Sequence, residues 1–356
     1  MDKISLLRDK MKQNGFDAVI VSEEINQRYL SEFHFSDGYI LIFSDAAYLI
    51  TDFRYYEAAI KNVSSTFEVI IPESPILFIE EQLKKHDVRV LGFEGASVSY
   101  QKYIYFSDRF SFLELKSIGN LISEMRAIKS SEEIEKMKKA QQITDFAFES
   151  VLKRLTTKMT EREVAIELDY AMRKSGAEDL AFDTIAVSGD ASAIPHGTAR
   201  NIQLKHGFLT MDFGAKFDGY CADMTRTVVV GKADNEMRKL YDTVLRAQTA
   251  ALEYLREGAD AGNADKTARD IIDSVPEYVG SFGHSLGHSI GLEVHEAPGL
   301  SRRNFGYKLK SGIVTSVEPG IYLPGKYGCR IEDMVLILGD GIFNFTSSTK
   351  ELIEIY

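Results

Sequence analysis

The chain of 356 residues contains only two cysteines, Cys221 and Cys329, and they form no CxxC pair. A disulfide framework or a thiolate metal site is therefore not expected. No apolar run approaches the roughly 20 residues needed to span a bilayer. The opening MDKISLLRDKMKQNG interleaves charged and apolar residues, unlike a signal peptide. We expect a cytoplasmic protein with two free thiols and no membrane partner.

The chain also has fewer basic residues than acidic ones. The chain has 42 Lys and Arg residues against 53 Asp and Glu, which gives a formal net charge of −11. This excess of negative charge disfavours a polyanionic partner such as nucleic acid. Hydrophobic residues make up 44% of the chain, enough for substantial cores, and the length fits two domains.

The two parts of the chain differ in their patterns, with a boundary expected near residue 125. Residues 1–125 alternate strand-like and helix-like stretches, which predicts an α/β domain. The expected strands are 17–22, 39–44, 47–52, 67–72 and 88–95, and the expected helices include 53–62 and 76–86. In residues 126–356, Ser130 or Ser131 can cap a helix, and Thr160 with Glu163 makes a capping box for another.

Three of the seven histidines lie in the stretch FGHSLGHSIGLEVHEAPG: His284, His288 and His295. His284 and His288 stand four residues apart, as in a zinc-binding HExxH helix, but no Glu lies between them. The glycines of this stretch would each cost about 1 kcal/mol inside a helix. We therefore expect extended or looping chain, with partners for the histidines from elsewhere.

Two acidic residues flank a predicted hairpin in GFLTMDFGAKFDGYCADMTRTVVVG. Asp212 and Asp223 are placed symmetrically about the Phe217–Asp218 junction, so a turn there would set the two carboxylates nearly opposite each other. A bulge could shift this register by one residue. Like charges facing across a ladder are destabilising, and a cation between them would compensate.

The same arrangement recurs in SVEPGIYLPGKYGCRIEDMVLIL. Glu318 and Glu332 are symmetric about Gly325 and are expected to face each other across a second hairpin. Arg330 shares the face of Glu332, because alternate residues of a strand point the same way. Two hairpins that present carboxylate pairs, together with the histidine-rich stretch, predict one clustered ligand set.

Four carboxylates and one imidazole form a hard, oxygen-rich set that suits divalent first-row ions. Two such ions would neutralise the four negative charges. Mn²⁺ is favoured over a structural zinc, while Co²⁺, Fe²⁺ and Zn²⁺ stay open. A pair of metal ions can deprotonate a water molecule and polarise a carbonyl group, which indicates hydrolysis of an amide or ester.

Taken together, these motifs resemble the creatinase/aminopeptidase P/prolidase family, and FDTIAVSGDASAIPHG extends the similarity. The resemblance covers residues 125–356 and is weaker over 1–125, in segments such as NQRYLSEF and TDFRYYEAA. It implies a creatinase-like N-terminal α/β domain over 1–125. It also implies an α+β "pita-bread" catalytic domain over 126–356, with a curved antiparallel sheet flanked by helices.

The resemblance implies a role for each residue of the ligand set. Asp223 and Glu332 would bridge both metal ions, Asp212 would complete one ion, and His288 with Glu318 would complete the other. Glu318 would also accept the proton of the attacking water.

The resemblance also implies residues that handle the substrate. His196, His284 and His295 would hydrogen-bond the substrate near the scissile bond, where negative charge develops. Arg330 would support the bridging carboxylates and substrate binding.

The resemblance implies an Xaa-Pro aminopeptidase of the aminopeptidase P type, acting on peptides with proline in the second position. SDGYILI and TDFRYYEAA lean toward this branch. The alternative is an Xaa-Pro dipeptidase, or prolidase, and a remoter one is a non-catalytic pita-bread binding module. Relatives of this kind are commonly homodimers or homotetramers.

Overall fold

The computed structural model describes residues 2–356, and the chain divides into two compact units, Met1–Arg126 and Ala127–Tyr356. The first unit is an α/β domain, as the alternation of strand-like and helix-like segments predicts. Its strands are β1 (Ala18–Val21), β2 (Tyr39–Phe43), β3 (Ala47–Ile50), β4 (Glu68–Ile70), β5 (Val90–Phe93) and β6 (Glu114–Ser117). They form one mixed sheet in the order β4-β3-β2-β1-β5-β6.

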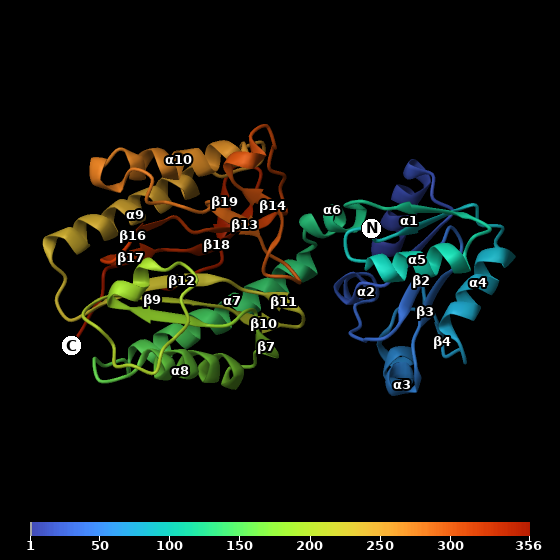
Figure 1. Cartoon of the computed structure of the whole chain (residues 1–356), viewed down its shortest axis with the longest axis horizontal. Helices are drawn as coiled ribbons and strands as arrows, with labels where there is room; N and C mark the ends of the chain where they lie inside the picture. Colours follow the sequence, from blue (N-terminus) through green and yellow to red (C-terminus); the bar gives the residue numbers. More distant parts are fainter. Residues whose placement is uncertain (1) are drawn as a thin grey trace. The chain divides into compact units, whose positions relative to one another are not determined.

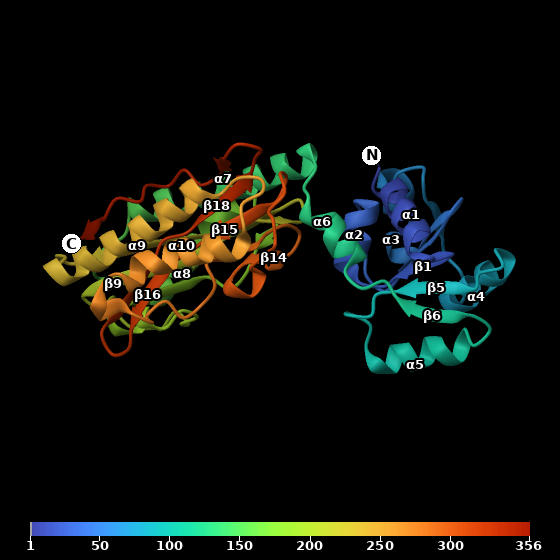
Figure 2. The same cartoon turned by 90° about the horizontal axis from the view of Figure 1, so that it is seen from above.

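Helices cover both sides of this sheet. They are α1 (Lys3–Asn14), α2 (Glu24–Ser31), α3 (Phe53–Asn62), α4 (Pro75–Lys85) and α5 (Tyr100–Arg109). The helix α6 (Leu121–Ala127) follows β6. Ile79 and Leu83 of α4 and Phe106 of α5 pack into the core with Ile20 and Leu41 of the sheet. Figure 2 shows α1 and α5 on opposite sides of β5 and β6. The strand β6 and the helices α2, α5 and α6 are additions to the sequence-based expectation.

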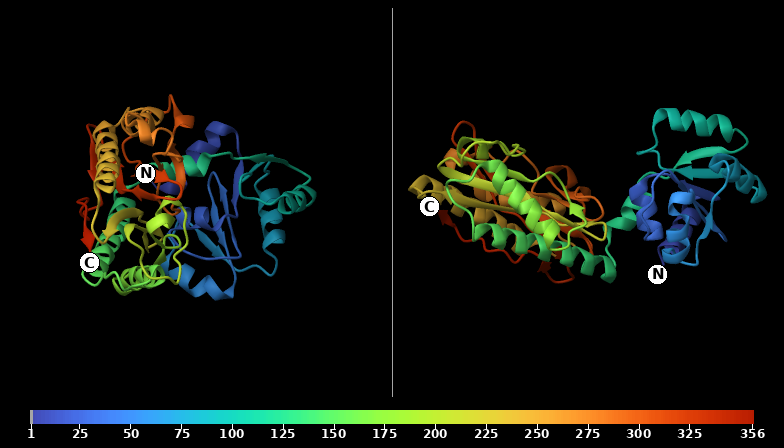
Figure 3. Two further views of the ribbon diagram at one scale, coloured as in Figure 1. Left: turned by 60° about the vertical axis from the view of Figure 1, so that its left-hand side comes forward. Right: turned by 90° about the horizontal axis from the view of Figure 1, so that it is seen from below.

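Two capped helices open the second unit. The helix α7 (Ser131–Leu152) begins at Ser130, whose side chain accepts from the backbone of Glu133 in a complete capping box. The helix α8 (Glu161–Lys174) has the predicted capping box of Thr160 and Glu163. These two helices pack side by side, as Figure 3 shows. Both predicted helix starts are confirmed.

The strands of the second unit form two main sheets. One has the order β20-β12-β9-β8 and the other β14-β13-β15-β18-β19. The first contains β8 (Ile185–Ser188), β9 (Gly207–Phe213), β12 (Met224–Val230) and β20 (Glu354–Ile355). The second contains β13 (Gly287–Ser289), β14 (Glu296–Leu300), β15 (Val314–Val317), β18 (Asp333–Ile337) and β19 (Ile342–Asn344). Smaller ladders join β7 (Asp179–Leu180), β10 (Ala215–Phe217) and β11 (Tyr220–Cys221), and β16 (Gly320–Leu323) with β17 (Tyr327–Arg330).

Helices flank these sheets on two sides. One core joins α7 and α8 to β8, β9 and β12. A second core joins α9 (Asn235–Tyr254) and α10 (Ala261–Asp273) to residues of β15 through β18. In Figure 1, β9, β12 and β18 lie between these two helix pairs. The stretch 282–299 contains β13, most of β14 and no helix, so its expected extended or looping conformation is confirmed.

The first predicted hairpin has a different register from the expected one. Its turn is centred on Asp218 and Gly219, which have φ values of 46° and 86°, and not on Phe217–Asp218. Asp-Gly suits a two-residue hairpin turn because both central residues need positive φ. The ladder consequently pairs Asp212 with Thr225, so the prediction that Asp212 lies opposite Asp223 is wrong.

The second hairpin has the predicted register. The ladder of β16 and β17 pairs Gly320 with Arg330, and the ladder of β15 and β18 pairs Val317 with Asp333. Both ladders share one register, which brings Glu318 and Glu332 to corresponding positions in the gap between them. The symmetric spacing about Gly325 is therefore confirmed.

A buried carboxylate at the start of α8 fixes the segment that follows β8 through hydrogen bonds. The side chain of Glu161 is fully buried and accepts five hydrogen bonds, from the backbone and hydroxyl of Ser188 and from the backbone and guanidinium of Arg200. Burial acts to raise the pKa of Glu161, but the hydrogen bonds from Arg200 and Ser188 outweigh it and lower the pKa below its ordinary 4.5.

We expect Glu161→Gln to lower the free energy of unfolding by about 2 kcal/mol at neutral pH, because a buried charge-assisted network loses its acceptor. A carboxyl with a lowered pKa in the folded state stabilises above its unfolded pKa, and that contribution is lost as pH falls through the folded value. Denaturant unfolding between pH 7 and pH 3 should therefore show the difference between wild type and variant shrinking. A difference independent of pH would contradict this account.

Among residues 2–356, no helix is long and apolar enough to cross a membrane.

Candidate active site

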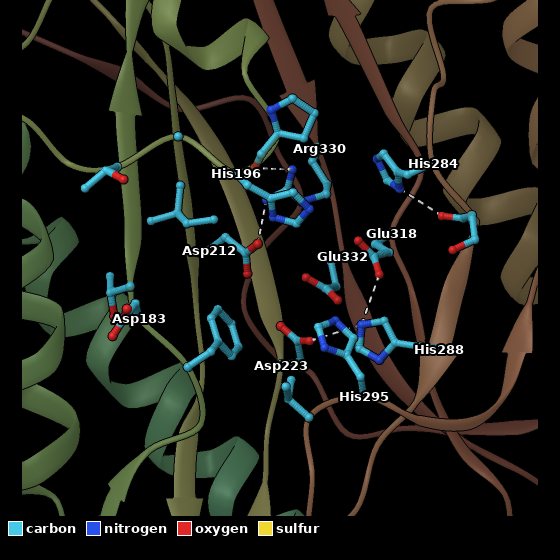
Figure 4. Close-up of a pocket in the computed structure, with 18 residues that line it drawn as sticks. Asp183, His196, Asp212, Asp223, His284, His288, His295, Glu318, Arg330 and Glu332 are labelled. Atoms are coloured by element: carbon cyan, nitrogen blue, oxygen red, sulfur yellow. Dashed lines mark hydrogen bonds and ion pairs between the residues drawn. The ribbon is translucent and has the colours of Figure 1, made fainter. Parts of the chain in front are cut away.

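A cavity of about 550 Å³ lies within the second unit, and all nine residues singled out in the sequence line it. Figure 4 shows these side chains converging from several strands and loops. The nine residues are His196, Asp212, Asp223, His284, His288, His295, Glu318, Arg330 and Glu332. Residues far apart in the chain thus reach one place.

Strands and the junctions between strands supply the acidic side chains. Asp212 belongs to β9, and Asp223 directly precedes β12. Glu318 lies between β15 and β16, and Glu332 between β17 and β18. His288 is the central residue of β13, which pairs with β15. Short, interrupted ladders therefore bring four carboxylates and an imidazole together.

Three of these residues form the tightest group. Asp223, His288 and Glu332 each offer a ligand atom within 4.8 Å of the others. Glu318 adjoins the group, since its Oε1 lies 3.3 Å from Nε2 of His288. Asp212 is not a member of this group and pairs with Arg330, whose Nη2 is 2.5 Å from Oδ2 of Asp212.

Hydroxyl groups orient two of the carboxylates. Thr225 donates to Oε2 of Glu332 at 2.7 Å, and Ser316 donates to Oε1 of Glu318 at 3.1 Å. The role of Thr225 was missed in the sequence. Its position two residues after Asp223, on the same side of an extended chain, was the available signal.

The donor set fits divalent cations. Two buried carboxylate oxygens, Oδ1 of Asp212 and Oε1 of Glu332, have no hydrogen-bond partner within residues 2–356. An unsatisfied buried acceptor costs about 1–3 kcal/mol. Coordination to a cation would satisfy both oxygens and neutralise the clustered charge.

The carboxylates influence one another's protonation. Burial, followed by the negative charges of Glu332 and Asp212, raises the pKa of Asp223 well above its ordinary value. Burial and the charges of Glu318 and Asp212 likewise raise the pKa of Glu332. Burial opposes ionisation of Glu318 too, but its hydrogen bond with His288 lowers its pKa to about 2. Only nearby positive charge allows every member of such a cluster to ionise.

The ring of His288 is oriented by the backbone. Its Nδ1 lies 3.2 Å from the carbonyl oxygen of Ser289. A carbonyl only accepts, so Nδ1 carries a hydrogen. Burial acts to lower the pKa of His288, but the hydrogen bond with Glu318 outweighs it and raises the pKa, so without a metal ion Nε2 carries a hydrogen too. Nε2 faces Asp223 and Glu318, at 3.6 and 3.3 Å, and once it loses its hydrogen it presents a lone pair to the same place. This is the orientation of a metal-ligating histidine.

A chain of hydrogen bonds occupies both ring nitrogens of His284. Nδ1 lies 2.8 Å from the carbonyl oxygen of Ser285, and Nε2 lies 2.9 Å from the hydroxyl of Tyr322. Arg330 donates to the same hydroxyl at 2.7 Å. Burial raises the pKa of Tyr322 to about 12 and lowers the pKa of His284, so Tyr322 donates to a neutral ring. Tyr322 was missed because its partners lie on other segments of the chain.

His295 and His196 differ from His284 in being exposed while lining the cavity. The ring of His295 lies 4.2 Å, between centroids, from the ring of His288. Partial desolvation of the ring by the cavity wall, together with the neighbouring His288, lowers the pKa of His295, so its imidazole is neutral near pH 7. A neutral imidazole beside the acidic cluster can donate one N–H to a bound carbonyl oxygen.

The two cysteines and the histidines His86 and His206 lie outside the residues that line the cavity. Cys221 and Cys329 are free and buried, and burial raises the pKa of each thiol to about 12. His86 stacks on Phe43 with centroids 4.1 Å apart, and exposed His206 lies 3.1 Å from a backbone carbonyl.

A cavity that gathers carboxylates, neutral imidazoles and unsatisfied oxygens defines a metal-dependent hydrolase site. Residues 135–338 match the model of metallopeptidase family M24, and residues 3–128 match the creatinase/prolidase N-terminal domain. The chain belongs to metallopeptidase family M24. The expected family, the metallopeptidase class and the two-domain fold with a C-terminal pita-bread unit are thus confirmed.

Several relatives match over the whole length. An Xaa-Pro dipeptidase of Pyrococcus furiosus is 38% identical over 354 residues, which are 99% of each chain. The structure of an Xaa-Pro dipeptidase from Bacillus anthracis has a TM-score of 0.95 at 39% identity and covers 100% of this chain and 99% of its own. That of an X-Pro aminopeptidase from Thermotoga maritima has a TM-score of 0.91 at 36% identity and covers 100% of both chains.

Proposed function

We propose that this metallopeptidase is an Xaa-Pro dipeptidase that uses two divalent metal ions to release free proline from Xaa-Pro dipeptides. The grouping of Asp223, His288 and Glu332 around one point of the cavity carries the metal-dependent part of the proposal. The full-length similarity to proteins named Xaa-Pro dipeptidase supports the substrate class and favours it over the aminopeptidase expected from the sequence.

In this proposal, five side chains would hold the two ions. Asp223 and Glu332 would be shared by both ions, Asp212 would complete one site, and His288 with Glu318 would complete the other. When bound, such an ion pair activates a water molecule and polarises the scissile carbonyl group. The hard donor set favours Mn²⁺, with Co²⁺, Fe²⁺ or Zn²⁺ as alternatives.

The protein's own groups would handle protons and charge. Glu318 is ionised and is oriented by the hydrogen bond from Ser316. It would therefore accept the proton of the attacking water. His295 would donate its N–H to the carbonyl oxygen as negative charge develops there, and His196 would bind the substrate from the exposed side. As the C–N bond breaks, the proline nitrogen must take up a proton, and Glu318 would return the one that it accepted.

Arg330 and His284 have supporting roles in this scheme. Arg330 pairs with Asp212 and donates to Thr225 and Tyr322, so it would hold the acidic cluster in place. His284, with both ring nitrogens engaged by the protein, would keep Tyr322 and thereby Arg330 oriented.

We also propose that the protein is a homodimer or homotetramer in the cytoplasm. Light scattering after gel filtration measures the number of subunits in the assembly.

The second candidate is an Xaa-Pro aminopeptidase, which acts on longer peptides. It is favoured by the similarity to the solved X-Pro aminopeptidase of Thermotoga maritima, at 36% identity over the whole chain. The two candidates share the metal site and differ in the length of the peptide that they accept.

The test is a substrate panel on protein stripped of metal and reloaded with Mn²⁺. The panel compares Ala-Pro, Ala-Pro-Ala and the matched control Ala-Ala. We expect kcat/KM for Ala-Pro to exceed the other two by about tenfold or more, a difference of at least ~1.4 kcal/mol in transition-state binding. Faster cleavage of Ala-Pro-Ala would establish the aminopeptidase. Equal cleavage of Ala-Ala would refute the proline requirement, and no cleavage at all would favour a non-catalytic binding protein.

A further inference from the structure

We infer that a buried ion pair between Lys129 and Glu296 positions His295 for catalysis, although neither residue lines the cavity. This inference rests on the proposed peptidase function. It makes Lys129 and Glu296 positioning residues, which act on the reaction only through the loop that carries His295.

The pair is isolated from water. Nζ of Lys129 lies 3.1 Å from Oε2 of Glu296, and the two side chains are 1% and 6% exposed. The residues are 167 positions apart in the chain, so the contact joins two distant segments. Charged side chains are almost never buried to this degree unless they are paired.

Glu296 closes the loop between β13 and β14. Its Oε1 accepts from the backbone N–H of Glu293 at 3.3 Å, and the backbone of Gly291 donates to the carbonyl of Glu293 at 3.0 Å. A Cβ added to Gly291 would come within 2.5–2.7 Å of the Glu296 carboxylate. The carboxylate therefore packs directly against the chain of the loop.

The loop is held at both ends, with His295 next to one of them. At one end, the backbone N–H of Cys221 donates to the carbonyl of Gly291 at 2.8 Å. At the other end, Glu296 directly follows His295 and is bound to Lys129. This second anchor thus holds the backbone directly next to His295, whose ring lies 4.2 Å from that of His288.

Lys129 is itself fixed to the body of the unit. Its backbone N–H donates to the carbonyl of Gly312 at 2.9 Å, and it directly precedes Ser130, the N-cap of α7. The N-cap of α7 and the segment before β15 thus fix the backbone of Lys129. Lys129 can consequently hold Glu296, and with it the loop between β13 and β14, in a fixed position.

The energetics of buried pairs suggest how to separate positioning from stability. Removing one partner leaves a buried charge without compensation and is destabilising, whereas replacing both by apolar groups is often neutral. Lys129→Met with Glu296→Met should therefore keep the fold while removing the anchor. Lys129→Arg keeps the charge and should retain most of the activity, and Lys139→Met, at an exposed site on α7, is the matched control.

The experiment measures kcat on Ala-Pro for these variants with and without His295→Ala. We expect Lys129→Met and the double Met variant to lose roughly 10–100-fold in kcat, as is typical when the support of a site residue is removed. Bound metal should stay at the wild-type level. In the His295→Ala background, Lys129→Met should cause little further loss, since residues that act as a unit are not additive. An equal loss in both backgrounds, or a double Met variant with wild-type kcat, would overturn the inference.

A second measurement does not depend on turnover. Hydrogen exchange of the 287–300 segment should be faster in Lys129→Met and in the double Met variant, and unchanged in Lys139→Met. If the wild type hydrolysed no Xaa-Pro peptide, the proposed function would fail while this measurement still tested the anchor. Unchanged exchange across 287–300 in the variants would overturn the anchor itself.

Discussion

Asp223→Ala and Glu332→Ala are each expected to abolish metal binding and hydrolysis together. Each substitution removes one of the two carboxylates of the group Asp223, His288 and Glu332, and only a carboxylate of this group could be shared by two ions. The loss of activity should exceed the roughly 10–100-fold that follows when only a residue supporting a ligand is altered. Metal analysis of the purified variants, together with Ala-Pro hydrolysis, measures both effects.

Two controls separate this effect from misfolding. Asp340→Ala removes an exposed carboxylate and should leave metal content and kcat unchanged. The melting temperature of metal-free Asp223→Ala should not fall below that of the metal-free wild type, because the substitution relieves repulsion among the buried carboxylates. A variant that retained the wild-type metal stoichiometry would refute the bridging assignment.

His295→Ala is expected to keep both metal ions and to lose about 10²–10³-fold in kcat, the range seen when a donor to a developing oxyanion is removed. The ring of His295 is exposed to the cavity and lies beside the ring of His288. It lies outside the group of ligand atoms formed by Asp223, His288 and Glu332. Steady-state kinetics on Ala-Pro and metal analysis of the same preparation test this.

The matched control is His206→Ala, which removes another exposed histidine of the same unit that lies outside the cavity. It should behave like the wild type in both measurements. An unchanged kcat in His295→Ala would remove His295 from the catalytic residues, and loss of metal in that variant would reassign it as a ligand.

The spacing of the acidic residues predicts the second hairpin better than the first. Glu318 and Glu332 are symmetric about a turn that contains Gly325, and the ladders on either side keep that register. In the first hairpin, the positive φ values of Asp218 and Gly219 centre the turn on that pair. Local turn chemistry therefore decided the register, and symmetry alone misplaced it.

Contacts between distant segments could not be predicted from the sequence. Thr225 and Tyr322 act through side chains that approach Glu332 and His284 only after the sheets have formed. Lys129 and Glu296 meet across 167 positions of the chain. Periodicity and capping predict single elements, whereas such contacts depend on how several elements pack.

The preference for an aminopeptidase came from segments that form the fold of the first unit. SDGYILI contributes to β2, and TDFRYYEAA contributes to α3. A protein named Xaa-Pro dipeptidase and one titled X-Pro aminopeptidase both align with the whole chain. These segments therefore indicate the fold of the first unit, and they do not distinguish a protein that cleaves dipeptides from one that cleaves longer peptides.

Anomalous diffraction from crystals grown with Mn²⁺ tests the central claim most directly. The account predicts two anomalous peaks about 4 Å apart, placed between Asp223 and Glu332, with His288 and Glu318 bound to one ion and Asp212 bound to the other. A cavity without anomalous density at saturating Mn²⁺, or a single ion bound away from Asp223 and Glu332, would contradict it.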